Sequence, residues 1–167
     1  MISTDELKEF LDFKVQQYNK PSFIEQDPIS IPHQFSTKED IEISTFLTAT
    51  ISWGNRKAIL KAANDLMGIM GESPFDFVMN STSNQLNRAS NFYYRTFNGS
   101  DLTYFIQSLR NIYLNHGGLE TIFSQNTNNN LHDSITNFRS LFFELPHEER
   151  TEKHISLHWH TYLLTYR

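Results

Sequence analysis

The fold is decided by residues 36–71, which read STKEDIEISTFLTATISWGNRKAILKAANDLMGIMG. Ser36 and Glu39 have the spacing of a capping box, in which a hydroxyl and a carboxylate bind free backbone N–H groups at the start of a helix. Beyond them, apolar side chains recur at helical spacing up to residue 51, so that one face of the segment is apolar. The first part of the stretch therefore predicts an amphipathic helix capped by Ser36.

The second part predicts another helix after a sharp corner. Gly54 tolerates the backbone conformation that commonly ends a helix, and Asn55 is a good cap for the next one. From residue 58 onward, apolar side chains again recur every three or four positions until Gly71. The corner, residues 52–55, would thus be the exposed turn of a helical hairpin, followed directly by two basic residues.

The rest of the chain is predicted to be helical as well. Ser3 and Glu6 form a second capping-box pair and predict a helix that ends near residue 20. Residues 21–35 contain three prolines and predict an extended connector. The later segments are assigned as a loop or frayed helix at 80–91, a short helix at 92–97, helices at 98–116, 119–123 and 131–145, and a polar loop at 126–130.

These elements predict an all-α fold, an orthogonally packed helical domain of about six to eight helices. We expect a single domain over residues 1–156, followed by an atypical tail over residues 157–167. The chain has no cysteine, which excludes disulfides and thiolate metal sites. No apolar run approaches the roughly 20 residues of a membrane span, and the acidic start is unlike a secretory signal, so we expect a cytoplasmic protein.

The net charge of −5 disfavours a strongly electrostatic nucleic-acid binder. The distribution is uneven, however. Residues 51–118 carry six basic and four acidic side chains, and they are the only third of the chain with a positive balance. This third contains the corner, which directs attention to Arg56 and Lys57.

Residues 46–70, FLTATISWGNRKAILKAANDLMGIM, resemble the first hairpin of the helix-hairpin-helix DNA glycosylases of the endonuclease III type. More closely, the chain from about residue 4 to residue 156 resembles a bacterial family of conserved hypothetical proteins, a domain of unknown function distantly related to that superfamily. The segments that carry this second resemblance are 52–56, 94–99, 102–113, 145–147 and 150–156.

The resemblance implies a place for DNA. In the glycosylases, a turn in this position wedges into the duplex where a base is flipped out. By position, that turn would be Trp53, Gly54 and Asn55, with Arg56 and Lys57 available to phosphates. Arg95 joins these DNA-binding candidates because it belongs to an aromatic-plus-base cluster, Tyr93-Tyr94-Arg95. The residues alone leave another interpretation open, in which Trp53 is buried at a helix end and the bases form a solvated face.

The catalytic parts of a glycosylase are missing from the pattern. The resemblance would require a Gly-x-Gly hairpin that holds a phosphate, and a later catalytic aspartate or lysine. Gly117-Gly118 is the only paired glycine, and it is typical of a helix stop. We therefore predict no catalytic residue, no cofactor and no metal, and we expect the chain to be the N-terminal part of a truncated or frameshifted family member.

Two further features bear on partners. Four histidines lie within a short stretch, and we interpret them as a polar tail rather than as a zinc or nickel site: His147, His154, His158 and His160. The helix at 131–145 is expected to expose an apolar patch and so to promote a homodimer. The predicted function is weak DNA binding by a glycosylase-like domain; the alternative is a helical protein-interaction or structural module with no nucleic-acid role.

Overall fold

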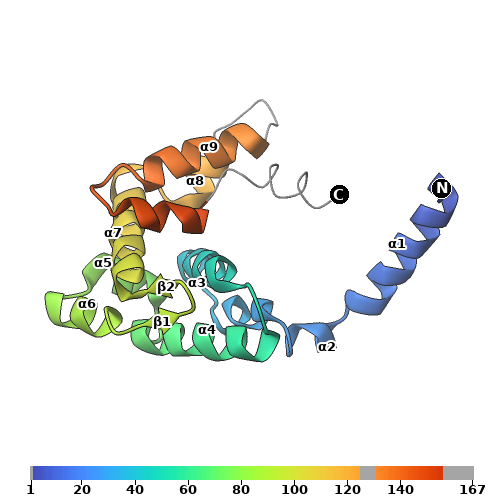
Figure 1. The fold of residues 1–167 in the computed structure, drawn as a ribbon, viewed down its shortest axis with the longest axis horizontal. Coiled ribbons are helices and arrows are strands. Elements are labelled where there is room, and N and C mark those ends of the chain that lie inside the picture. Colours follow the sequence, from blue (N-terminus) through green and yellow to red (C-terminus); the bar gives the residue numbers. More distant parts are fainter. Residues whose placement is uncertain (1, 125–130, 156–167) are drawn as a thin grey trace.

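The computed structural model describes residues 2–124 and 131–155. The all-α prediction is confirmed, because helices build the domain and the strands form one short antiparallel pair (Figure 1). The elements are α1 Thr4–Tyr18, α2 Pro21–Ile24, η1 Pro28–Ser30, η2 Pro32–Gln34, α3 Lys38–Ile51, α4 Arg56–Met70, α5 Pro74–Asn80, α6 Ser83–Ala89, β1 Tyr93–Tyr94, β2 Phe97–Asn98, α7 Gly99–Asn115, α8 Leu119–Ser124, α9 Leu131–Phe142 and η3 Glu149–Ile155. Among the described residues helices are more numerous than predicted, because the predicted connector at 21–35 contains short helices and α6 forms where a loop or frayed helix is predicted.

The predicted hairpin is formed by α3 and α4, but its first cap differs by one residue. The cap is Thr37, not Ser36, and its hydroxyl contacts the carboxylate of Asp40. Asp40 is buried, and its other oxygen accepts hydrogen bonds from Ser73 Oγ at 2.9 Å and from Phe75 N at 2.8 Å. This carboxylate therefore joins the start of α3 to the start of α5, a tertiary contact that the local spacing did not reveal.

The core of the domain lies between the helices of the hairpin and α7. The inward faces of α3 and α4 contribute mainly Ile43, Leu47, Ile51, Ile59, Ala63, Leu66 and Met70. In Figure 1, α7 extends from the layer of α4 to α6 towards α8 and α9. Its buried side chains include Leu102, Phe105, Ile106, Leu109 and Ile112. The hairpin is thus fixed from one side, which leaves the corner between α3 and α4 at the edge of the domain.

The N-terminal region confirms one prediction and corrects another. Ser3 and Glu6 form the predicted capping box of α1. Residues 21–35 do not form an extended connector, because they fold into α2, η1 and η2. Each of these short helices has a proline in its first turn, where the backbone N–H that proline lacks is not needed. Ile31 is fully buried within these turns, and this burial draws the segment onto the core.

Residues 92–97 were predicted as a short helix, and this is wrong. Tyr94 pairs with Phe97 and Tyr93 pairs with Asn98, so the segment folds back on itself as a hairpin. Its turn begins at Arg95, which has a positive φ of 57°. The aromatic composition favours a strand, and the helix is preferred at the level of sequence because no partner strand is evident there. The partner strand begins only two residues after β1 ends.

The apolar patch predicted on the helix at 131–145 is smaller than expected. Phe138 and Phe142 of α9 are buried, and the ring of Phe46 from α3 lies 5.5 Å and 5.4 Å from theirs. Among the apolar side chains of α9, Leu131 and Ile135 are exposed and Leu141 is half-buried. Exposed apolar side chains gather instead on α1, which has no buried residue and extends away from the other helices in Figure 1. The predicted loop at 126–130 lies outside the described residues.

Candidate functional site

The corner between α3 and α4 is a tight turn held by its own backbone. Trp53 N donates to Ile51 O at 2.8 Å, and Ser52 Oγ donates to Thr48 O at 2.7 Å. Gly54 follows with φ 110°, a conformation that side chains rarely adopt. The predicted cap of α4 is confirmed, since Asn55 Oδ1 accepts from Lys57 N and Ala58 N. Helix α4 therefore starts directly beside the turn.

Trp53 lies at the surface and has partners from the β-hairpin. The residue is 39% exposed, and its ring centroid lies 6.2 Å from that of Tyr94 in an edge-to-face arrangement. The Tyr94 hydroxyl donates to Trp53 O at 3.1 Å. The guanidinium group of Arg95 lies 5.0 Å from the Trp53 ring centroid, within the range of a cation–π interaction. The fold thus brings Arg95 onto Trp53 from a distant part of the chain.

Arg95 also contacts the backbone of the corner. A Cβ atom at Gly54 would lie only 2.4 Å from Arg95 Nη2. A side chain at Gly54 would therefore displace this guanidinium group, quite apart from the positive φ. Gly54 thus leaves room for the Arg95 guanidinium group against the turn, so the glycine has a packing role in addition to its conformational one.

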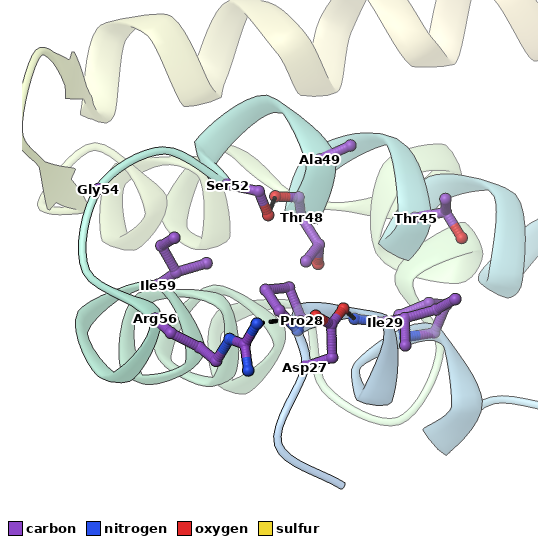
Figure 2. A pocket seen from close by; sticks show the side chains of 11 residues that line it. Asp27, Pro28, Ile29, Thr45, Thr48, Ala49, Ser52, Gly54, Arg56 and Ile59 are labelled. Carbon is purple, nitrogen blue, oxygen red and sulfur yellow. Dashed lines mark hydrogen bonds and ion pairs between the residues drawn. The ribbon is translucent and has the colours of Figure 1, made fainter. Parts of the chain in front are cut away.

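Arg56 and Lys57 point to different surroundings. Arg56 Nη2 lies 3.8 Å from Asp27 Oδ2 (Figure 2). The guanidinium group of Arg56 lies 5.7 Å from the ring centroid of Phe23. Its charge is therefore partly balanced by the segment that precedes α3. Lys57 is exposed, and within the described residues no ion pair neutralises either Lys57 or Arg95. Arg95, on the indole, and Lys57, in the first turn of α4, therefore have no ion-pair partner among the described residues.

All six candidate residues accordingly lie in one region: Trp53, Gly54, Asn55, Arg56 and Lys57 are consecutive, and Arg95 covers the first two of them. The burial proposed for Trp53 in the alternative interpretation is not complete, since more than a third of the residue is exposed. Sequence reasoning missed Asp27, which it placed in a connector. The only available signal was its position before Pro28, typical of a capped turn.

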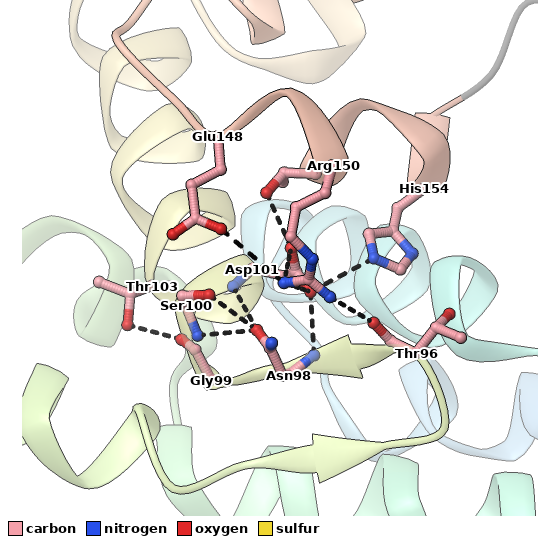
Figure 3. A network of polar contacts seen from close by, with 10 residues as sticks. Thr96, Asn98, Gly99, Ser100, Asp101, Thr103, Glu148, Arg150 and His154 are labelled. Carbon is pink, nitrogen blue, oxygen red and sulfur yellow. Dashed lines mark hydrogen bonds and ion pairs between the residues drawn. The ribbon is translucent and has the colours of Figure 1, made fainter.

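A second polar cluster surrounds Asp101, at the start of α7 (Figure 3). This carboxylate is fully buried and accepts hydrogen bonds from Asn98 N at 3.0 Å and from Thr151 Oγ1 at 2.8 Å. Arg150 Nη1 lies 3.3 Å from Asp101 Oδ2. The cluster fastens η3 to the first turn of α7. It also fastens η3 to the turn between β1 and β2, because Arg150 donates to Thr96 O at 3.1 Å.

His154 completes this cluster. Its side chain is 5% exposed and packs edge to face against Phe97. Its Nε2 atom lies 3.3 Å from Asp101 Oδ2 without the geometry of a hydrogen bond. Burial lowers the pKa of His154, and the nearby Asp101 carboxylate opposes this only in part. We therefore expect His154 to be neutral in the folded protein at neutral pH.

His147 is also part of the fold. It contacts Leu145 O through Nδ1 at 2.7 Å and Glu152 Oε1 through Nε2 at 3.1 Å. Hydrogen bonds from His147 and Arg139 lower the pKa of Glu152. The predicted tail of surface histidines is thus wrong for His147 and His154, and His158 and His160 lie outside the described residues. In the part of the chain that the structure describes, no group of three or more ligand-type side chains could hold a metal ion.

Among the described residues, none of the helices has the length and apolarity needed to cross a membrane.

Comparison with known proteins places the chain in a family. No curated protein and no solved structure matches the sequence significantly. Residues 27–161, which include both clusters, match the family described as "Protein of unknown function (DUF2400)". Because this match covers most of the sequence, the chain belongs to the DUF2400 family.

Proposed function

We propose that this protein is a DNA-binding helical domain of the glycosylase type, which contacts DNA through the corner at residues 53–57 and through Arg95. The observation that carries the proposal is the arrangement of Arg95 over the exposed indole of Trp53. An aromatic ring with a cation on it combines a surface on which bases stack with a charge that attracts phosphates. No catalytic step is part of the proposal.

The first turn of α4 adds to this surface. Lys57 is exposed there, and the N-terminal end of a helix carries a partial positive charge that favours phosphate. The proposed contacts involve three cations, Arg56, Lys57 and Arg95. Three neutralised phosphates correspond to a slope of at most about −2.7 for log K against log salt. Because the whole chain carries −5, we expect weak binding that salt abolishes easily.

The test is fluorescence anisotropy with labelled DNA duplexes, one intact and one with an abasic site, at about 25 mM and 150 mM salt. The double variant Arg56→Ala, Lys57→Ala should bind at least ~10-fold more weakly than the wild type. Lys61→Ala is the matched control, since Lys61 lies one turn further along α4 and pairs with Asp65 at 2.6 Å. Salt-insensitive binding, or none at micromolar protein, would remove the proposal.

A helical protein-interaction module, including a homodimer, is the second candidate, and the surface of α1 favours it. Leu7, Phe10 and Leu11 are about half exposed on this helix, and clustered apolar side chains on a surface commonly mark an interface. Sedimentation of the whole chain and of a Leu11→Glu variant tests it. Self-association that the variant abolishes supports this candidate, and a wild-type monomer counts against homodimerisation.

A further inference from the structure

A pocket of about 460 Å³ lies behind the corner, between α3, the first turn of α4 and η1 (Figure 2). Much of its wall is apolar and comes from Pro28, Ile29, Pro32, Ala49 and Ile59. The pocket is therefore large enough for a small organic molecule with an apolar body. Its specificity depends on the few polar groups that face it.

Two of these groups stand side by side without satisfying each other. Arg56 Nη2 and Asp27 Oδ2 are 3.8 Å apart, which is longer than a hydrogen bond. The other oxygen of Asp27 accepts from Ile29 N at 3.1 Å and caps η1. Within the described residues, neither Asp27 Oδ2 nor the guanidinium group of Arg56 takes part in a hydrogen bond. The pocket thus presents a free donor next to a free acceptor.

A third polar group lies on the wall formed by α3. Thr48 is 3% exposed and points from α3 towards Pro28 (Figure 2). Its Oγ1 atom has no hydrogen-bond partner among the described residues. A buried hydroxyl without a partner is unfavourable, and a small bound molecule is one way to satisfy it. A ligand in this pocket would supply one after a small adjustment of the wall.

The charges decide what kind of ligand fits. An anion would be attracted by Arg56 but repelled by Asp27. A cation would be attracted by Asp27 but repelled by Arg56. A neutral group that carries an acceptor beside a donor satisfies both side chains. In an amide, the standard bond lengths place oxygen and nitrogen about 2.2 Å apart. Hydrogen bonds of roughly 2.9 Å from these two atoms reach groups separated by 3.8 Å.

We infer that this pocket binds a neutral small molecule that carries a primary carboxamide or a lactam on an apolar body. In these groups the C=O and an N–H lie on the same edge, whereas a trans backbone amide presents them on opposite sides. The carbonyl accepts from Arg56 and, after the small adjustment of the wall, from Thr48 Oγ1. The N–H donates to Asp27 Oδ2, and the apolar body lies against Ile29 and Ile59. This inference does not depend on DNA binding.

The test compares three probes that share an aromatic body: benzamide, benzoate and benzylammonium. Each is titrated into the ¹⁵N-labelled full chain and followed by amide chemical shifts. Benzamide should shift amides of Thr48, Ala49 and Arg56 with a Kd on the order of 1 mM, as expected for a ligand of this size. Benzoate and benzylammonium should bind at least ~10-fold more weakly. Equal or tighter binding of either charged probe, or no shift with benzamide up to about 20 mM, would overturn the inference.

Two variants locate the contact. Asp27→Asn keeps an oxygen for the Ile29 N–H but replaces the free acceptor by a donor, so benzamide affinity should fall at least ~10-fold. Thr48→Val removes the hydroxyl at nearly constant shape and should weaken binding several-fold. Thr50→Val is the control, because Thr50 lies on the same helix and donates to Phe46 O at 2.9 Å, outside the pocket. Unchanged affinity in both Asp27→Asn and Thr48→Val would contradict the inference.

Discussion

The guanidinium group of Arg95 lies 5.0 Å from the ring centroid of Trp53, and it crosses the backbone of Gly54. Arg95 holds this position from the first residue of a hairpin turn, where its φ is 57°. A positive φ is unfavourable for a non-glycine residue. The fold therefore accepts some backbone strain while it places a cation on Trp53, the aromatic residue of the corner.

Substitution of Arg95 separates backbone strain from surface chemistry. Arg95→Gly relieves the positive φ but loses the cation–π contact, so we expect a change in unfolding free energy within about 1 kcal/mol of zero. Arg95→Ala loses the same contact and keeps the strain, so it should be the less stable of the two. Urea denaturation measures both variants. If Arg95→Ala proved as stable as Arg95→Gly, the strain would be negligible.

The same two variants also report on the proposed DNA surface. Both lack the cation, so both should weaken binding to the abasic duplex to a similar extent and lower the salt slope by about 1. Arg88→Ala serves as a comparison, because Arg88 is a basic residue of α6 outside the corner. Equal loss of binding in the Arg88 variant would point to a general charge effect rather than to the corner.

Gly99 marks a close approach of two backbone segments. A Cβ atom at this position would lie 1.8 Å from Ser90 O, so no side chain fits without movement of the backbone. We expect Gly99→Ala to destabilise the fold by more than about 2 kcal/mol, as measured by thermal or urea unfolding. Gly68→Ala is the matched control: it lies inside α4 with nothing within 4 Å, and alanine there should stabilise by roughly 0.5–1 kcal/mol.

Asp101 is the centre of the contacts that hold η3. Asp101→Ala leaves Asn98 N and Thr151 Oγ1 without an acceptor and Arg150 without its buried partner. We expect a loss of about 2–4 kcal/mol in unfolding free energy, together with faster hydrogen exchange in η3. Asp65→Asn, which removes an exposed pair with Lys61, should cost about 0.5 kcal/mol or less. Unaltered exchange in η3 would show that other contacts hold the segment.

His154 makes stability depend on pH. Burial lowers its pKa below the value of 6.5 in the unfolded chain, so in a window below pH 6.5 the unfolded state binds more protons than the folded state. Its contribution is therefore fully present above pH 6.5 and is lost as the pH falls through the lower folded pKa. Unfolding free energies at several pH values between 5 and 8 measure this effect. His154→Gln should flatten the curve in that range, and an unchanged slope would exclude His154 as its source.

Several helix boundaries could be predicted from the sequence because caps are local. Ser3 and Asn55 each bind N–H groups two or three residues away, and spacing alone reveals such pairs. The start of α3 could not be fixed in this way, since Ser36 and Thr37 both offer a hydroxyl. Asp40 decided between them, and its orientation depends on Ser73 and Phe75 from another helix.

Apolar patterns gave the helical faces but not what covers them. The helices at 4–18 and 131–142 both show an apolar stripe, yet Phe138 and Phe142 are buried whereas Phe10 and Leu11 are exposed. Periodicity states which side chains share a face. Whether that face is covered depends on how the other elements pack. The pattern along one helix carries no information about this packing.

By itself, the sequence determined an all-helical chain, the two helices of the hairpin, and the corner of Trp53, Gly54 and Asn55 with two cations beyond it. Only the tertiary structure decided that Arg95 lies on Trp53, that Asp27 lies beside Arg56, and that His154 is buried beside Asp101. The physical reason is range. Caps and turns satisfy backbone groups within a few residues, whereas contacts between distant side chains exist only after the whole core has packed.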